Sequence, residues 1–124
     1  MYHCNVSIDV PDLASAVRFY IEAFRLRLKG EPIKGMVVLQ TINLDVYLLE
    51  KAGETQACSD SSTQRVYSRH WTPVHLDFIV SNLSSALERA VAAGANHEGC
   101  DKGDRGEIAY YSDPFGNGFC LIEK

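Results

Sequence analysis

Polar and apolar residues follow each other along the chain in a pattern that predicts strands and helices. In 4–10, Val6, Ile8 and Val10 alternate with polar residues, which predicts a strand with one buried face. A helix should begin after Asp12, because Asp is a good N-cap and apolar residues then recur at helical spacing. The predicted buried stripe of this helix is Leu13, Val17, Tyr20 and Phe24. Turn residues then separate three predicted strands, at 26–31, 36–41 and 44–50.

The second half of the chain repeats this order of elements. A predicted strand over 74–80 places His75, Asp77 and Ile79 on one face. Asn82 is the predicted N-cap of the second helix, and Gly94 suits its C-terminal end. The predicted buried stripe of this helix is Leu83, Leu87, Ala90 and Val91, and the predicted strands after it are 96–100, 106–112 and 118–123. Segment 46–51 (VYLLEK) also resembles 119–124 (FCLIEK), which indicates a duplicated unit.

Length and composition limit the possible functions. We interpret the 124 residues as one domain, with modules at 1–51 and 73–124 and a connecting loop at 52–72 that is either a lid or a flexible linker. A net charge of −4 without a basic cluster disfavours nucleic-acid binding, and no apolar run reaches membrane-spanning length. The four cysteines lack a paired short spacing, so we expect reduced thiols and a cytoplasmic location: Cys4, Cys58, Cys100 and Cys120.

Two βαβββ units, with the turn Asp-Pro-Phe-Gly-Asn-Gly at 113–118 before the last strand, resemble the vicinal oxygen chelate superfamily. That superfamily includes glyoxalase I, bleomycin resistance proteins, fosfomycin resistance enzymes and extradiol dioxygenases. The resemblance covers essentially the whole chain. It implies an α+β fold in which two tandem βαβββ modules form a curved mixed sheet around a shared cleft. It also implies a homodimer that holds a small molecule in that cleft.

Catalytic members of this superfamily bind a divalent metal through four side chains, usually His and Glu. The candidate set by residue type is His3, Glu50, His75 and Glu123. The superfamily spacing indicates other positions, because the first ligand of each half lies seven residues before the helix cap and the last ligand lies seven residues after the turn Asp. The repeat offset of 73 residues then gives the equivalent last-strand position in the first half. Those positions hold Asn5, Tyr47, His75 and Cys120. Asn and Tyr are poor ligands for such a site, so we expect no stoichiometric nickel, iron, manganese or zinc.

The alternative hypothesis is that the protein is a metal-dependent enzyme. A bulge or a slipped register would turn Glu50 or Glu123 inward to join His75, as in a metal-dependent lyase, isomerase or dioxygenase. Catalysis without a metal, through His75 and Asp77, is a third possibility. No catalytic residue is assigned.

The polar strand positions define a candidate ligand-binding cleft: Asn5, Ser7, Asp9, Tyr47, His75, Asp77, Tyr111 and Cys120. Two carboxylates beside tyrosine rings favour a neutral or cationic aromatic ligand, although these carboxylates could equally face water at an open mouth. Cys120 is either a nucleophile or a small residue in the wall. Trp71 is either an aromatic wall or a contact that holds the loop in place.

Overall fold

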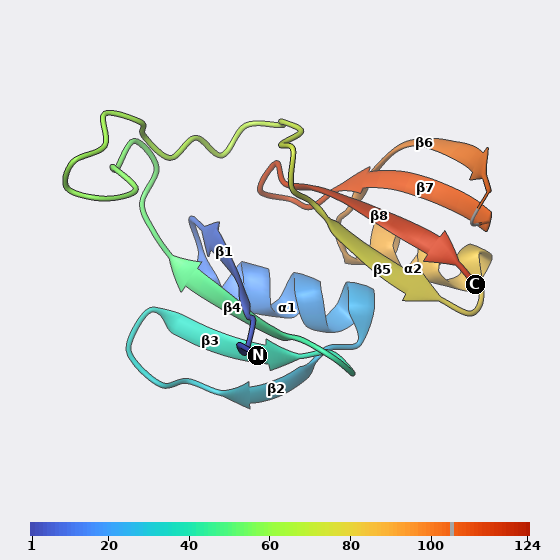
Figure 1. The fold of residues 1–124 in the computed structure, drawn as a ribbon, viewed down its shortest axis with the longest axis horizontal. Helices are drawn as coiled ribbons and strands as arrows, with labels where there is room; N and C mark the ends of the chain where they lie inside the picture. Colours follow the sequence, from blue (N-terminus) through green and yellow to red (C-terminus); the bar gives the residue numbers. More distant parts are fainter. Residues whose placement is uncertain (105) are drawn as a thin grey trace. The chain divides into compact units, whose positions relative to one another are not determined.

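The structure, a computed structural model, describes residues 1–104 and 106–124 and contains two βαβββ modules, each with its own mixed four-stranded sheet (Figure 1). The predicted α+β fold of two tandem modules is therefore confirmed, and the described strands form no closed barrel. The elements in chain order are β1 (Val6–Val10), α1 (Leu13–Phe24), β2 (Arg27–Gly30), β3 (Met36–Gln40), β4 (Asp45–Glu50), β5 (Leu76–Val80), α2 (Leu83–Ala93), β6 (Asn96–Gly103), β7 (Gly106–Ser112) and β8 (Gly118–Glu123).

The chain divides into two compact units, which are described separately. The first unit comprises Met1–Ile21 and Arg25–Tyr67 and has the strand order β1-β4-β3-β2. β1 runs parallel to β4, with Ile8 beside Leu48, and the other pairs are antiparallel. Asp12 caps α1 as predicted, because its side chain accepts a hydrogen bond from the Ser15 amide (2.7 Å).

The second unit comprises Glu22–Phe24 and Ser68–Lys124 and has the equivalent order β5-β8-β7-β6. β5 runs parallel to β8, and a bulge between His97 and Gly99 interrupts the pairing of β6 with β7. Asn82 caps α2 through the Ser85 amide (2.8 Å), and Gly94 ends it in the left-handed region (φ 118°). The shared cleft stays a prediction.

The buried stripes of both helices are rotated from the predicted ones, because small alanines occupy their centres. In α1 the buried residues are Ala16, Phe19, Tyr20 and Ala23, so Tyr20 alone of the predicted stripe is buried. In α2 they are Leu83, Ala86 and Ala90, while the predicted Val91 is half exposed. Alanine lets a helix approach a sheet closely, and a stripe chosen by side-chain size misses it.

Each end of the connecting loop makes hydrogen bonds to the unit to which it belongs. In the first unit, Arg65 forms an ion pair with Asp9 (Nε to Oδ2, 2.7 Å), and the Tyr67 hydroxyl donates to the Lys51 carbonyl (2.7 Å). In the second unit, the His70 amide donates to the Gly116 carbonyl (3.1 Å). Each end of the loop thus contacts its own unit, and the choice between a lid and a flexible linker stays a prediction. Among the described helices, none has the length and apolar character to cross a membrane.

Candidate functional site

An open groove in the second unit brings aromatic and charged side chains together. It has a volume of about 490 Å³ and is lined by Trp71, Thr72, Pro73, His75, Glu98 and Tyr110. The Trp71 ring meets both neighbouring rings edge-on, with its centroid 5.5 Å from that of His75 and 6.1 Å from that of Tyr110. Such a corner of ring faces and edges suits a flat apolar guest.

Three polar side chains gather beside this groove on one face of the second sheet. Asp77 pairs directly with Cys120 across the parallel strands β5 and β8, so the two side chains project from the same face. His75, two residues before Asp77, shares that face, and its Nε2 lies 3.2 Å from Asp77 Oδ1. The ligating atoms of His75, Asp77 and Cys120 all lie within 4.8 Å of one another. The structure therefore brings together three of the residues that the sequence analysis assigned to the cleft.

Cys120 is not set up as a nucleophile. The side chain is 3 % exposed, and burial, together with the charge and hydrogen bonding of Asp77, raises the pKa of its thiol to about 11. The protonated thiol predominates at neutral pH, whereas nucleophilic attack requires the thiolate. Of the two predicted roles for Cys120, the structure disfavours the nucleophile, and it places Cys120 as a small buried residue of β8, beside His75 and Asp77.

Trp71 is held by a network that starts in the connecting loop. The Arg69 guanidinium donates to both carboxylate oxygens of Glu98, and its Cζ lies 4.6 Å from the centroid of the Trp71 ring. The Trp71 indole N–H donates to Glu98 Oε2 (3.1 Å). The hydrogen bonds between Arg69 and Glu98 stabilise both charges. They hold the pKa of Glu98 below its usual value and the pKa of Arg69 above its usual value. Trp71 is therefore a groove wall, and the same contacts fasten the loop to β6.

The prediction for Tyr111 is wrong. Tyr111 pairs with Phe119 and is fully buried, on the sheet face opposite to Cys120. Its hydroxyl has no hydrogen-bond partner among the described residues, and burial, with a smaller contribution from Cys100, raises its pKa to about 12. Its neighbour Tyr110 pairs with Cys120 and lines the groove instead. A shift of one residue along a strand exchanges the two faces.

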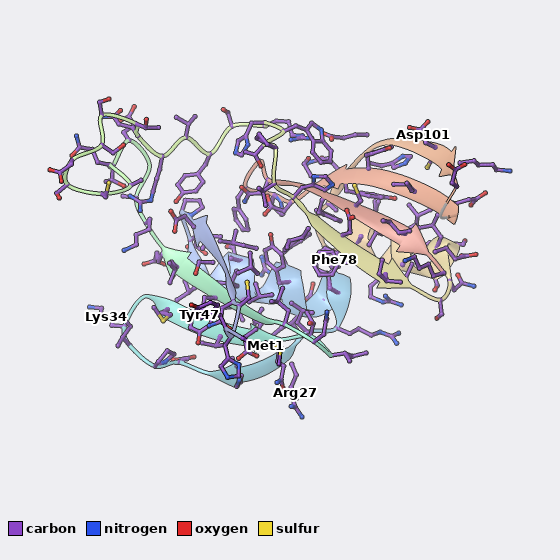
Figure 2. All side chains as sticks on the ribbon, viewed as in Figure 1. Met1, Arg27, Lys34, Tyr47, Phe78 and Asp101 are labelled. Atoms are coloured by element: carbon purple, nitrogen blue, oxygen red, sulfur yellow. The ribbon has the colours of Figure 1, made fainter. Side chains whose placement is uncertain are left out.

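The candidate residues of the first unit carry weaker chemistry. Ser7 pairs with Tyr47 across β1 and β4, so both lie on one face, and Figure 2 labels Tyr47 on β4. Asn5 is exposed just before β1. Asp9 is ion-paired with Arg65, which offsets the negative charge that the sequence analysis assigned to it. The ion pair weakens the expectation of an acidic site from Asp9, because the connecting loop supplies a cation to this strand; a role for Asp9 in ligand binding stays a prediction.

Glu50 and Glu123 have the same structural role in the two units. Glu50 Oε2 accepts a hydrogen bond from the Leu13 amide at the start of α1 (2.8 Å). Glu123 Oε2 accepts one from the Leu83 amide at the start of α2 (2.6 Å). Each carboxylate thus satisfies a free amide at a helix N-terminus, where negative charge is favourable. Within β8, Glu123 and Cys120 lie on opposite faces, so the alternative that pairs His75 with Glu123 is not supported.

Glu98, Tyr110 and Arg69 are site residues that sequence reasoning missed. Arg69 reaches the groove from the loop, and the bulge between His97 and Gly99 breaks the alternation beside Glu98. The signal that could have located Tyr110 is the Gly118–Cys120 end of β8, since counting back across a tight connection pairs Cys120 with Tyr110.

Comparison with known proteins agrees with this architecture. The model of the glyoxalase-like domain family matches residues 5–122. No curated protein matches the chain. An integron cassette protein from the mobile metagenome of V. cholerae is 22 % identical, with a TM-score of 0.67 and coverage of 99 % of this chain and 95 % of that one.

Two further solved structures share the fold at lower identity. The fosfomycin resistance protein FosX from Listeria monocytogenes is 17 % identical, with a TM-score of 0.75 over 100 % of this chain and 93 % of that one. Lactoylglutathione lyase from Agrobacterium tumefaciens is 16 % identical, with a TM-score of 0.66 over 98 % and 92 %. The chain belongs to the glyoxalase-like domain family, within the vicinal oxygen chelate superfamily.

Proposed function

We propose that this protein binds a small neutral or cationic aromatic molecule in the groove of its second unit, without a divalent metal. The observation that carries the proposal is the corner formed by Trp71, His75 and Tyr110 beside the Asp77 carboxylate. Rings that meet edge-on offer faces for stacking and for cation–π attraction, each worth roughly 0.5–2 kcal/mol. Arg69 is occupied by Glu98, so an anionic ligand has no free lysine or arginine partner among the described groove residues.

Fold resemblance leaves the reaction open. The neighbours named above are a resistance protein and a lyase, and one fold supports different chemistries in them. The superfamily nevertheless implies a divalent metal, and the residues of this chain fit such a site poorly. Asn5 and Tyr47 replace its usual ligands in the first unit, while Glu50 and Glu123 accept hydrogen bonds from helix amides.

A metal-dependent enzyme is the second candidate, and one observation favours it. His75, Asp77 and Cys120 offer nitrogen, oxygen and sulfur ligands close to one another. Such a mixed set suits zinc better than a hard ion. Elemental analysis of the purified protein separates the two candidates. We expect no stoichiometric metal, and an ion lost on Asp77→Asn or Cys120→Ala substitution would favour the second candidate.

The first candidate is tested by calorimetry with matched aromatic probes. Benzyl alcohol and protonated benzylamine should bind, whereas benzoate should not. Trp71→Ala should weaken both by about tenfold, the loss expected from one ring contact of about 1.4 kcal/mol. Leu28→Ala, in which a half-exposed side chain on β2 is removed, is the control and should leave both affinities unchanged. Equal binding of benzoate would contradict the proposal.

We also infer a homodimer in the cytoplasm. The dimer inference rests on the superfamily resemblance and the location on the free cysteines. Light scattering at tens of micromolar protein should give twice the mass of 13.8 kDa. A monomeric mass at that concentration would refute the dimer.

A further inference from the structure

The groove has two carboxylates near its rings, and they differ in their partners: Glu98 faces an arginine, whereas Asp77 faces a histidine and a thiol. Glu98 lines the groove, but both of its oxygens accept hydrogen bonds from Arg69. This fork-to-fork contact joins two partly buried side chains, which are 30 % and 27 % exposed. A bidentate arginine–carboxylate pair is geometrically specific and leaves little net charge to attract a ligand. Glu98 therefore contributes a hydrogen-bond acceptor for Trp71 rather than an open anionic site.

Asp77 is in a different position. Its side chain is 36 % exposed, and among residues 1–104 and 106–124 it makes no ion pair with a lysine or arginine. Asp77 contacts the His75 ring nitrogen (3.2 Å) and the Cys120 thiol, which donates a hydrogen bond to it. A carboxylate has about four acceptor positions, so Asp77 keeps room for further N–H donors.

A second carboxylate, that of Asp101, adds negative charge to the sheet face that carries Asp77. Asp101 on β6, labelled in Figure 2, pairs with Ile108 and accepts a hydrogen bond from the Tyr110 hydroxyl. Ile108 and Tyr110 are two residues apart on β7, so Asp101 lies on the same side of the sheet as Tyr110. The groove thus has an aromatic wall, and the Asp77 carboxylate lies next to it, in contact with the groove residue His75.

We propose that the ligand is a protonated aryl-alkyl amine whose N–H groups donate to Asp77, while the Arg69–Glu98 pair acts as a neutral positioning element for Trp71. This inference rests on the proposed function and names the ligand class and the charge-recognising residue. A flat ring beside Trp71 and Tyr110 leaves a short alkyl arm to carry the ammonium group towards Asp77. A quaternary ammonium lacks the N–H donors that such a carboxylate would accept.

Calorimetry with three probes of nearly the same shape tests the inference: protonated benzylamine, benzyltrimethylammonium and benzyl alcohol. Benzylamine should bind about tenfold more tightly than either of the others, as expected for one added charge-assisted hydrogen bond. In Asp77→Asn this preference should vanish, while the affinity for benzyl alcohol stays the same.

The double variant Arg69→Gln with Glu98→Gln is the matched control, because it removes one charge of each sign. It should weaken all three probes together through the loosened Trp71, and it should keep the tenfold preference for benzylamine. A preference that survives Asp77→Asn, or disappears in the double variant, would overturn the inference while leaving the proposed function intact. Failure of all three probes to bind the wild-type protein would overturn both.

Discussion

The Gly118→Ala substitution tests whether the Trp71 wall is fixed by the start of β8. A Cβ added at Gly118 would lie 2.6, 2.7 and 2.8 Å from Trp71 ring atoms Cε3, Cζ3 and Cδ2. Carbon atoms pack without repulsion at about 3.5–4.0 Å, so the ring must move by about 1 Å. A shift of that size is large beside the 3.1 Å bond from the indole N–H to Glu98, which we expect to weaken or break.

The energetic cost follows from the lost contact and the clash. A hydrogen bond to a charged group contributes about 1.5–3 kcal/mol, but Trp71 is 45 % exposed, so water replaces part of it. Overpacking adds about 1–3 kcal/mol where neighbours cannot move, and less at an exposed ring. We expect the free energy of unfolding to fall by about 1–2 kcal/mol in this variant. Benzyl alcohol should bind more weakly as well, because its wall has moved.

The assay is direct because Trp71 is the single tryptophan of the chain. Urea unfolding followed by circular dichroism gives the free energy, and the native emission spectrum reports the environment of the Trp71 ring. Gly30→Ala is the control, since a Cβ there meets no atom within 4 Å. That variant should be neutral or slightly stabilising, by up to about 1 kcal/mol. Unchanged emission and unchanged stability in Gly118→Ala would refute the argument that Trp71 is fixed in place.

Two further predictions concern the helix N-termini and alkaline pH. Glu123→Ala removes the acceptor of the Leu83 amide and should lower the free energy of unfolding by about 1–2 kcal/mol in urea titrations. Glu123→Gln should lose less, and an alanine variant as stable as wild type would contradict this role. Because burial raises the pKa of Cys120 from 9.0 to about 11, the folded state binds its proton more tightly than the unfolded state, and stability falls as pH rises from about 9 to 11. The slope from this one group is at most about 1.4 kcal/mol per pH unit, and Cys120→Ala should show a correspondingly smaller decline in urea unfolding across that range.

Much of the fold could be predicted from the sequence, because the relevant forces are local. Asp12 and Asn82 bind amides three residues ahead of them, and Gly94 adopts a φ that other residues avoid. Alternation in 74–80 set the faces of β5, and the register of β8 agrees with it. Each of these features depends on the alternation of side chains along a strand or on a single backbone position. A stretch of a few consecutive residues is therefore enough to predict it.

The site was only partly predictable, because its completion depends on contacts that are distant in the chain. Arg65 and Arg69 come from a loop without periodicity, yet they decide which carboxylates keep their charge. Tyr110 and Tyr111 are distinguished only by the register of β7 with β8, and alternation within β7 alone does not give that register. A strand prediction accurate to one or two residues cannot assign the face of an aromatic pair.

The duplication itself separates structural from chemical roles. Both halves need an acceptor for the first amide of their helix, and each half supplies a glutamate at the end of its last strand: Glu50 and Glu123. A groove needs its chemistry only once. At matched positions the first unit has Ser7 and Tyr47, and the second has Asp77 and Cys120. A residue present in both copies therefore indicates what the fold requires. The polar positions at which the two modules differ are the candidates for ligand binding, and Asp77 is the first that substitution should test.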